Sequence, residues 1–405
     1  MPTIHVNSPA NLLGPGGSRS LRATLRQLST ALEADSEAAW RDLERRSLLA
    51  NPFTSSAFVS SSLFACPPRE SPLLLTVEDH AGRWLAAGVF STSNGNRSLP
   101  LPHLSALPFD HVFKTSLLID AVHAPTVVES LLELLRREGW HGLQFPKFPI
   151  GSPLSLLLTS ACDAAGLSTV IDDAHQRAMV DARESDTGTG ISNARAKSMR
   201  RGRRYLEARG NVAFRWRGCR NNDLSAAEQF LTLEAMGWKG AARTALASQG
   251  ESANFFRRLV TTLGEQDRIF FAECLLDQQV IASACLFRSE ADYYVFKLGW
   301  NPVYERAGPG YLLAAEIRQR ARELPGCRRI DGCARPGSFL EHVWSDRKLI
   351  GDALFTTTKW GAAAAQGTQW ARSIMRLVRG GGGVPAADLM SLVEPEAELE
   401  VREDA

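Results

Sequence analysis

A glycine-containing loop between a predicted strand and a predicted helix is the first segment whose residues could bind a phosphate. The strand covers Asp292–Trp300, and the helix follows Gly308 and Gly310. Glycine lets a backbone approach a phosphate closely, and a helix N-terminus offers free N–H groups and the positive end of its dipole. Arg306 could add a charge-assisted hydrogen bond. The segment therefore suits a pyrophosphate such as that of coenzyme A, although the same glycines could serve turn geometry alone.

A second candidate is the basic helix predicted over Asn193–Arg209, with Ser192 or Asn193 as its N-cap. Its basic residues lie within about three turns and surround most of the helix. They are Arg195, Lys197, Arg200, Arg201, Arg203 and Arg204. Three interpretations stay open: a solvated surface, a surface for an anionic partner such as a carrier protein, a polysaccharide precursor or tRNA, and direct contact with coenzyme phosphates.

A third candidate lies where a helix predicted over Ser225–Gly237 ends. Ser225 is its expected N-cap, and Glu228 would complete a capping box. Glycines flank Trp238 and Lys239 directly after this helix and would carry both side chains into a loop. They could form a wall of an acceptor pocket, or the Trp could be buried while the Lys amine reaches water.

The elements that must position these candidates follow from the spacing of apolar residues. In the first half of the chain we expect a helix over Leu21–Leu49, a β-hairpin of Pro72–Val77 and Trp84–Phe90, a helix over Ala124–Gly139 and a strand over Trp140–Phe148. In the second half we expect strands at 212–216, 269–276, 280–288 and 328–332, and helices at 253–263 and 310–323. Because the order of elements is similar in both halves, the chain is predicted to contain two α/β units.

A polar segment rich in Gly and Thr, Asp181–Asn193, is the predicted boundary between these units. We therefore expect a flexible lead over residues 1–20, an N-terminal domain over 21–185, a C-terminal domain over 186–370 and a flexible tail over 371–405.

Composition restricts the class of protein. Lys and Arg number 46 and Asp and Glu 44, so the net charge of +2 argues against a protein that coats nucleic acid. No apolar run reaches the about 18 residues of a membrane span, and the polar start does not resemble a secretory signal. The seven cysteines form no CxxC pair and the histidines are dispersed, which predicts neither a metal site nor a disulfide framework. We expect a cytoplasmic protein without a metal.

Five segments are each weak evidence for a protein family when taken alone, but their order along the chain is specific. They are Lys197–Glu207, Leu233–Gly240, Phe296–Trp300, Gly308–Leu313 and Ile330–Gly332. Together they resemble the acetyltransferase domain of the CelD-like (BioF2-like) branch of the GNAT superfamily, which is related to the FemAB aminoacyl transferases. The resemblance covers residues 170–360, and residues 26–170 look like the amino-terminal half of such proteins.

This resemblance implies an α/β (α+β) fold with two GNAT-like units, each a mixed, mostly antiparallel sheet flanked by helices. Diverging central strands would admit the pantetheine arm of a thioester. The implied activity is that of a GNAT-type N-acyltransferase, with acetyl-CoA, another acyl-CoA or an acyl-carrier protein as donor. The acceptor would be the amine or hydroxyl of a small molecule or an envelope precursor.

The resemblance also assigns binding residues. Donor binding falls on Arg306, Gly308, Pro309, Gly310, Tyr311 and Leu312. Acceptor binding is expected at Trp238, Lys239, Tyr294, Arg200 and Arg204.

Acyl transfer needs a proton acceptor, stabilisation of an oxyanion and a proton for the leaving thiolate. Asp331, at the end of a short strand beside the expected divergence, is the candidate base, and Lys297 could hold the substrate or Asp331. Tyr311, or alternatively Tyr304, could protonate the thiolate. Each of these side chains could instead be structural, and His342 is interpreted as structural. The chain has no Gly-x-Ser-x-Gly motif, which argues against a hydrolase.

One position departs from the family pattern. The usual GNAT phosphate loop begins with Arg or Gln three residues before its first glycine, where this chain has Glu305. A carboxylate there would repel phosphate unless Arg306 takes over. Two alternatives therefore stay open: a FemAB-like transferase that uses aminoacyl-tRNA, favoured by the basic helix, and a non-catalytic GNAT-fold binding subunit, favoured by Glu305.

Overall fold

The computed structural model describes residues 10–11, 21–31, 34–68, 70–183, 191–221 and 223–378. The first half contains β1 (Ala10–Asn11), β2 (Arg22–Gln27), α1 (Leu28–Ala31), α2 (Ala34–Arg46), η1 (Pro52–Thr54), α3 (Ser56–Ala65), β3 (Leu73–Glu78), β4 (Trp84–Ser93), β5 (His103–Ala106), β6 (Leu118–Ile119), α4 (Ala124–Arg137), β7 (Gly142–Pro149), α5 (Pro153–Ala164) and β8 (Thr169–Asp181). The second half contains α6 (Asn193–Glu207), β9 (Val212–Gly218), α7 (Ser225–Met236), α8 (Trp238–Ala241), η2 (Leu246–Ser248), α9 (Gly250–Glu265), β10 (Ile269–Leu276), β11 (Gln279–Ser289), β12 (Asp292–Trp300), η3 (Pro302–Ala307), α10 (Pro309–Gln319), η4 (Ala321–Glu323), β13 (Arg329–Asp331), η5 (Phe339–His342), β14 (Asp346–Thr356) and α11 (Lys359–Val378).

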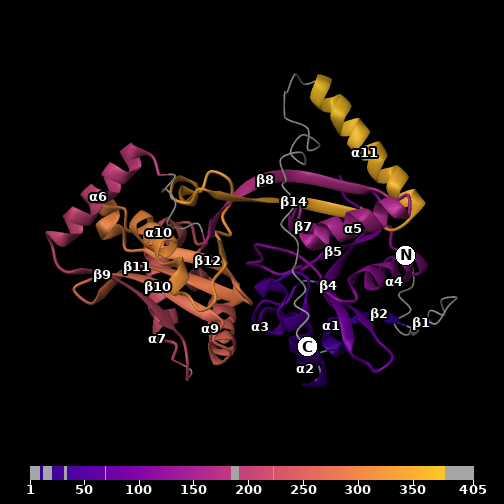
Figure 1. Ribbon diagram of the computed structural model, residues 1–405, viewed down its shortest axis with the longest axis horizontal. Coiled ribbons are helices and arrows are strands. Elements are labelled where there is room, and N and C mark those ends of the chain that lie inside the picture. The colour runs from indigo at the N-terminus through magenta and orange to yellow at the C-terminus, as the bar shows by residue number, and fades with distance from the viewer. Residues whose placement is uncertain are drawn as a thin grey trace.

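These elements form two α/β units that share one sheet (Figure 1). The strand order β2-β3-β4-β5-β7 in the first unit repeats as β9-β10-β11-β12-β13 in the second. In both units neighbouring strands are antiparallel except the last pair, since β5 is parallel to β7 and β12 is parallel to β13. The expected fold class, an α/β fold with mixed and mostly antiparallel strands flanked by helices, is confirmed, but the strands of the two units form one continuous sheet instead of two.

The centre of the sheet is built by an exchange of strands between the units. β8 follows β7 in the chain but pairs with β13 of the second unit. β14 follows β13 in the chain but pairs with β7 of the first unit. β8 and β14 also pair with each other. Neither unit therefore completes its sheet without the other, and β14 and α11, expected in the second domain, lie with the first unit (Figure 1).

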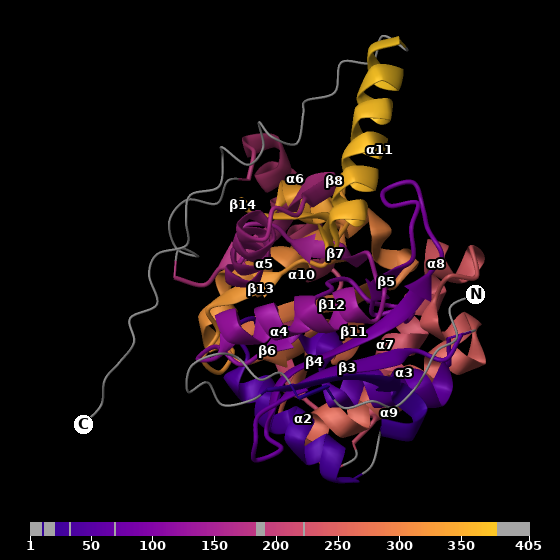
Figure 2. The ribbon, with the colours of Figure 1, turned by 90° about the vertical axis from the view of Figure 1, so that its right-hand side faces the viewer.

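Helices cover both faces of the first unit's sheet. Figure 2 shows α4 across one face, with α2 and α3 on the opposite side. Successive side chains of a strand point to opposite faces of the sheet. In β3, Leu73 and Leu75 therefore belong to the core under α4, whereas Leu74 belongs to the core that includes α2 and α3.

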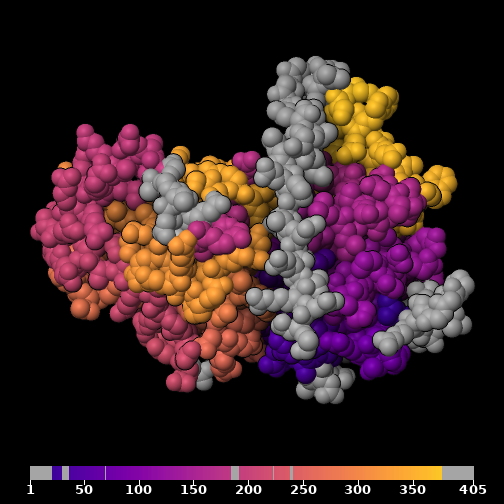
Figure 3. All heavy atoms as spheres, in the orientation of Figure 1, coloured from indigo at the N-terminus to yellow at the C-terminus, as the bar shows by residue number. Residues whose placement is uncertain are grey.

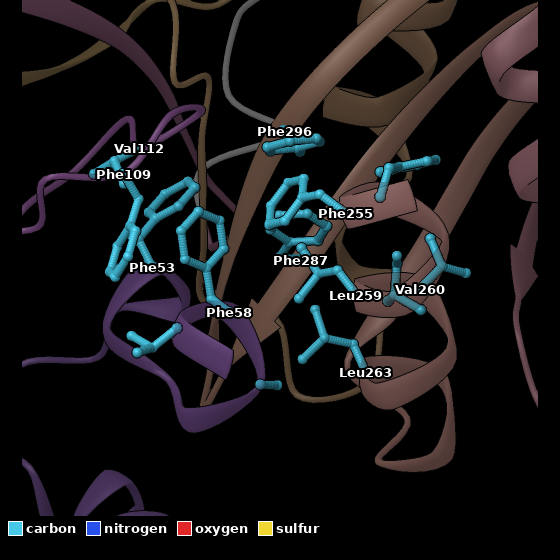
Figure 4. Close-up of a cluster of buried hydrophobic side chains, with 14 of the residues drawn as sticks. Phe53, Phe58, Phe109, Val112, Phe255, Leu259, Val260, Leu263, Phe287 and Phe296 are labelled. Atoms are coloured by element: carbon cyan, nitrogen blue, oxygen red, sulfur yellow. The ribbon is translucent and has the colours of Figure 1, made fainter. Parts of the chain in front are cut away.

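That second core continues across both units (Figure 4). Phe53 of η1 and Phe58 of α3 approach Phe287 of β11 and Phe255 of α9, with ring centroids 6.3 and 5.4 Å apart. Phe296 of β12 stacks on Phe287 at 4.6 Å. The two units are thus joined by buried aromatic packing as well as by strands.

Several local expectations are corrected. The helix expected over Leu21–Leu49 is wrong in its first part, because Arg22–Gln27 form β2 and pair with β3. Pairing along a buried strand has overridden the helical spacing of the apolar residues. The helical part of the chain reaches Val378, beyond the expected start of the tail at residue 371. The hairpin and the helix beginning at Ala124 are confirmed.

Some expectations fall on residues that the structure does not describe. These are the lead apart from residues 10–11, the boundary between residues 185 and 186, and the tail from residue 379. Within the described residues, no group of three or more His, Cys, Asp and Glu side chains could hold a metal ion. No helix in the same part of the chain is long and apolar enough to cross a membrane.

Candidate active site

The parallel ladder between β12 and β13 is short. Asp292–Tyr294 pair with Arg329–Asp331, and β13 ends there, whereas β12 continues to Trp300. The edge of β12 beyond Tyr294 is thus outside the ladder with β13. Backbone groups at such an edge must find other partners, and a ligand can supply them.

A β-bulge interrupts β12 in the part that lies beyond this ladder. Lys297 lies opposite Cys285 and Val295 opposite Leu286, so Phe296 is the extra residue. Bulges redirect side chains and occur often beside active sites. In β12 the bulge immediately precedes Lys297, which was singled out from the sequence.

Lys297 pairs with a buried carboxylate of α7 rather than with Asp331. Its Nζ lies 3.2 Å from Oε1 of Glu234, whose side chain is fully buried. Oε2 of Glu234 accepts a hydrogen bond of 2.8 Å from the Leu246 N–H. A Cβ at Gly299 would lie 2.8 Å from the backbone of Glu234, so the absence of a side chain there lets α7 pack directly on β12.

The predicted donor-binding residues form a single turn at the end of β12. Gly308 adopts the left-handed conformation (φ 62°, ψ 52°) that favours glycine, and it is the N-cap of α10. The N–H groups of Tyr311 and Leu312 donate to its carbonyl at 2.9 and 3.1 Å. Pro309 takes the first helical position, which needs no N–H donor. Glu305 and Arg306 are exposed on the preceding turn.

The basic helix α6 packs on this same turn. A Cβ at Gly202 would overlap the carbonyl oxygen of Ala307, the residue before Gly308. The guanidinium of Arg195 lies 4.4 Å from the ring centroid of Tyr311, and that of Arg306 lies 5.6 Å from the ring of Tyr205. Two candidates that are about a hundred residues apart in sequence therefore form one cationic surface, which we call the α6–η3 surface.

The predicted acceptor-binding residues do not all come together. Arg200 and Arg204 are exposed on α6. Trp238 and Lys239 lie in α8, directly after α7. A Cβ at Gly240 would overlap the carbonyl oxygen of Ala235, so this turn folds tightly back on α7.

Tyr294 and Asp331 lie at the end of the ladder between β12 and β13, in a buried polar cluster between the units. The Tyr294 hydroxyl donates to the carbonyl of Ala50 at 2.8 Å and accepts from Nζ of Lys114 at 2.8 Å. Asp331 accepts from Arg177 at 3.3 Å and from the Cys333 N–H at 2.8 Å, both through Oδ1. The hydroxyl of Tyr294 is thus engaged within the protein.

Burial and charge set the ionisation of this cluster. Burial alone would raise the pKa of Asp331, but the positive charges of Arg177, Lys348 and Lys114 outweigh it and hold that pKa below its ordinary value. Burial lowers the pKa of Lys114 well below its ordinary value. Oδ2 of Asp331 is buried and receives no hydrogen bond from the described residues.

A histidine from the other unit approaches Lys297. His111 lies on the connection between β5 and β6, with a positive φ of 62°. Its ring stacks on Phe255 at 5.7 Å and meets Phe296 edge-on at 6.1 Å, and its Nε2 lies 3.2 Å from the Ser252 hydroxyl. Burial lowers the pKa of His111 to about 4, and the charge of Lys297 adds to this effect.

Sequence reasoning did not identify Lys114, Arg177 or His111. Their signal is weak: Lys114 is a single cation in a mostly apolar segment, and His111 follows an aspartate in a loop. Their roles depend on contacts with the second unit, which local spacing does not reveal. The tyrosines proposed for proton transfer are less deeply placed, and Tyr311 packs against Phe339 with ring centroids 5.1 Å apart.

Comparisons with known proteins agree with this architecture. A family model for the acetyltransferase (GNAT) domain matches residues 193–337. The crystal structure of FemX has a TM-score of 0.51 at 9% identity, over 79% of this chain and 96% of that chain. The C-terminal domain of a putative lysylphosphatidylglycerol synthetase from Agrobacterium fabrum has a TM-score of 0.49 at 15% identity, over 82% and 94%.

At these identities the likeness to FemX shows the fold alone. No curated protein matches the sequence. The family match covers the basic helix, the bulged strand, the glycine turn and the end of β13. Residues 193–337 of this chain are therefore similar to the acetyltransferase (GNAT) domain, and the match spans about a third of the chain.

Proposed function

We propose that the protein is a cytoplasmic acyltransferase that moves an acyl group from a thioester donor, an acyl-CoA or an acyl-carrier protein, to an amine or hydroxyl acceptor. The observation that carries the proposal is the early end of the β12–β13 ladder, which leaves the edge of β12 beyond Tyr294 outside that ladder directly before the glycine turn and α10. This arrangement offers a strand edge for the pantetheine arm and the positive end of the α10 dipole for the phosphates.

The donor end of the site is supported by charge. In our proposal the diphosphate lies at Gly308–Leu312, and Arg306 contributes a charge-assisted hydrogen bond. The α6–η3 surface adds the exposed cations of α6, and these offset the carboxylate of Glu305. The departure of Glu305 from the family pattern is thus compensated by a helix that packs on the same turn.

The proposed reaction begins when the acceptor nitrogen or oxygen attacks the thioester carbonyl carbon and forms a C–N or C–O bond. The C–S bond then breaks, and the coenzyme leaves as a thiolate. The proton of the acceptor passes to Oδ2 of Asp331, and Tyr311 protonates the thiolate. The low pKa of Asp331 is more compatible with an amine than with a hydroxyl acceptor, because the amine nitrogen becomes positively charged when it attacks the carbonyl and then gives up its proton much more readily than a neutral hydroxyl does.

We assign positioning of the acceptor to the pair of Lys297 and Glu234. The pair follows the bulge of β12 and is fixed by the N–H of Leu246. A buried pair that is already oriented costs little reorganisation when a polar acceptor binds beside it. Trp238 and Lys239, on the helix that follows α7, are the proposed outer wall.

Calorimetric titration of the full chain tests the donor assignment. Acetyl-CoA, longer acyl-CoAs and an acylated carrier protein are titrated separately, and CoA and dephospho-CoA serve as a matched pair that differs only in one phosphate. Binding of at least one thioester, and weaker binding of the ligand with less charge, is expected. Absence of binding to all of the thioesters overturns the proposal.

A second candidate function, transfer from aminoacyl-tRNA, is favoured by one observation. Lys197, Arg200, Arg201, Arg203 and Arg204 are all exposed on α6. A tRNA held there would be displaced steeply by salt, since each phosphate contact releases counterions. Gel shifts with tRNA over a salt series distinguish the two donors, because a single diphosphate contact depends on salt much less.

A further inference from the structure

Two cations lie opposite each other on the exchanged strands where the units meet. Figure 1 shows β8 and β14 running between the units, and Figure 3 shows the two halves of the chain side by side. Arg177 of β8 is the direct cross-strand partner of Lys348 of β14. Side chains in such a pair lie on the same face of the sheet, and like charges there are destabilising. The exchange of strands therefore creates a position where an anion would be favourable.

Three further cations surround this pair. The side chain of Lys114 is fully buried, and the charge of Lys348 adds to the effect of burial in lowering its pKa. Burial, together with the charges of Arg335 and Arg177, also lowers the pKa of Lys147. The five side chains thus act on one another, and we call them the junction cations. They are Lys114, Lys147, Arg177, Arg335 and Lys348.

Fewer carboxylates lie among the junction cations. Asp331 accepts a hydrogen bond from Arg177, and Oδ1 of Asp352 accepts one from the Lys147 N–H at 2.8 Å. Asp292 also acts on Lys114, but its carboxylate is shared with Arg329, whose Nε lies 3.5 Å away. Positive charge therefore exceeds negative charge at the junction, even if the deeply buried Lys114 is neutral.

Several polar groups of this cluster have no partner within the described part of the chain. Lys348 is half-buried and Arg335 is exposed, and neither side chain forms a hydrogen bond or an ion pair there. Nε of Arg177 and Oδ2 of Asp331 are buried and have no hydrogen-bond partner among the described residues. Buried polar groups are nearly always satisfied in folded proteins, so this cluster lacks a polar group that a ligand could supply.

The junction cations lie on the face of the sheet opposite to α10. Ala178 of β8 belongs to the core that contains α10, so the neighbouring Arg177 points to the other face. There Arg177 donates to the carbonyl of Phe113 at 2.8 Å, and Phe113 packs against the core that joins the units. A donor at the glycine turn and an anion among these cations would therefore approach Asp331 from opposite faces.

We propose that the junction cations bind an anionic group of the acceptor, a carboxylate or a phosphate, with Lys348 and Arg335 as its direct contacts. The assignment to the acceptor rests on the proposed function, whereas the anion site does not. A bound anion would offset the positive charges that act on Asp331 and would raise the pKa of its carboxyl. Asp331 thus becomes a stronger base only when the acceptor is present.

Thermal unfolding of the full chain tests the anion site without the reaction. Sodium phosphate and sodium succinate are each titrated against sodium chloride at equal ionic strength, so that charge screening is matched. Because a ligand that binds the folded state raises Tm, the wild-type Tm is expected to rise by about 2 °C or more with at least one of them. The anion that acts at lower concentration distinguishes a phosphate from a carboxylate. Lys348→Gln and Arg335→Gln together are expected to raise the half-saturating concentration about fivefold or more.

Two control variants locate the response. Arg22→Gln removes an exposed cation of β2, which β3, β4 and β5 separate from β7, and should respond as the wild type does. Arg200→Gln with Arg204→Gln removes cations of the α6–η3 surface and should keep the response that the junction variant loses. A wild-type chain without a response, or a junction variant that responds like the wild type, overturns the proposal. A response that only the α6 variant abolishes also overturns it, because the anion is then held on the donor side.

Calorimetry with acetyl-CoA tests the assignment to the acceptor. The junction variant should bind acetyl-CoA within about twofold of the wild type, since the cluster faces away from the donor turn. Loss of acetyl-CoA binding in this variant would overturn the assignment to the acceptor. A wild-type chain that shows the anion response but binds no thioester would refute the proposed function and leave the anion site standing.

Discussion

Gly202 of α6 lies directly against the carbonyl oxygen of Ala307, in the turn that leads into the left-handed Gly308. A glycine inside a helix costs about 1 kcal/mol relative to alanine, so its presence needs a reason. The reason here is contact, since any Cβ at this position would overlap the backbone of the turn. The basic helix and the proposed phosphate turn are thus one structural unit.

The first prediction concerns this contact. Gly202→Ala is expected to destabilise the protein by about 1–3 kcal/mol and to weaken acyl-CoA binding, because α6 must move away from the turn. Gly367→Ala is the matched control: it is also helical, but a Cβ there meets nothing within 4 Å. That variant is expected to gain up to about 1 kcal/mol. Urea unfolding measures the stability of the two variants, and calorimetry measures their affinity for acyl-CoA. If Gly202→Ala and Gly367→Ala changed both quantities equally, the argument from the contact would be refuted.

The second prediction concerns the charges on the turn. Glu305→Gln removes a carboxylate beside the proposed diphosphate and is expected to tighten acyl-CoA binding about two- to fivefold, the effect of one exposed charge. Arg306→Gln is expected to weaken it by at least as much. Val303→Ala, an exposed change on the same turn, serves as the control. Both charge effects should shrink as salt is added, and a Glu305→Gln variant that binds the donor more weakly would contradict the proposed position of the phosphates.

Local signals allowed much of the second unit to be predicted. The hydroxyl of Ser192 accepts from the Arg195 N–H and caps α6 as expected. At α7 the same reasoning was wrong: Ser225 is the first helical residue, its hydroxyl and N–H bind Asp223, and Glu228 pairs with Arg257. A cap depends on a few neighbouring residues, but a nearby carboxylate can displace it by one position.

The exchange of β8 and β14 could not be predicted in this way. Both strands pair with residues that are more than a hundred positions away in sequence, such as Ile350 with Pro149 and Asp331 with Met179. Periodicity indicates that a strand exists but not which strand lies beside it. For the same reason Lys114, in the connection between β5 and β6, and Arg177, on β8, were missed, because they meet Tyr294 and Asp331 of the second unit.

The third prediction concerns the buried pair of Asp331 and Arg177. Asp331→Asn leaves the guanidinium buried without its counter-charge and is expected to cost about 3–5 kcal/mol at pH 7. Replacing both residues, with Asp331→Leu and Arg177→Met, should recover most of this loss. Glu207→Gln breaks an exposed pair with Arg203 and should cost less than about 1 kcal/mol. Urea unfolding of the wild type, Asp331→Leu, Arg177→Met and the double variant gives the coupling energy of the pair, and a value near zero would show that the pair does not contribute to stability.

The pair also predicts a pH dependence. The pKa of Asp331 is lower in the folded protein than in the unfolded chain. The ionised carboxylate therefore adds to the free energy of unfolding in full at any pH above its pKa in the unfolded chain, which is about 3.9. It is lost as the pH falls through the folded value. The stability difference between wild type and Asp331→Asn should therefore be constant from pH 7 to about 5 and should shrink only in stronger acid.

The fourth prediction concerns His111 at the contact between the units. Burial lowers its pKa to about 4 in the folded protein, whereas an unfolded histidine titrates near 6.5. Between these values the unfolded chain binds more protons, so stability must fall as the pH drops from about 6.5 to about 4, by at most about 3 kcal/mol. Below pH 4 both states are protonated and the loss ends. His111→Asn, which tolerates the positive φ, should lose less stability over this interval.

His80→Asn is the control, because His80 is exposed in the turn of the β3–β4 hairpin. As the pH falls, this variant should lose as much stability as the wild type does. Since the ring of His111 packs on Phe255 and Phe296, beside the bulge that precedes Lys297, its protonation should loosen the junction where the acceptor is proposed to bind. Activity should therefore fall over the same pH interval as stability in the wild type and less steeply in His111→Asn. Identical acid profiles for these two proteins would show that His111 does not couple the junction to the site.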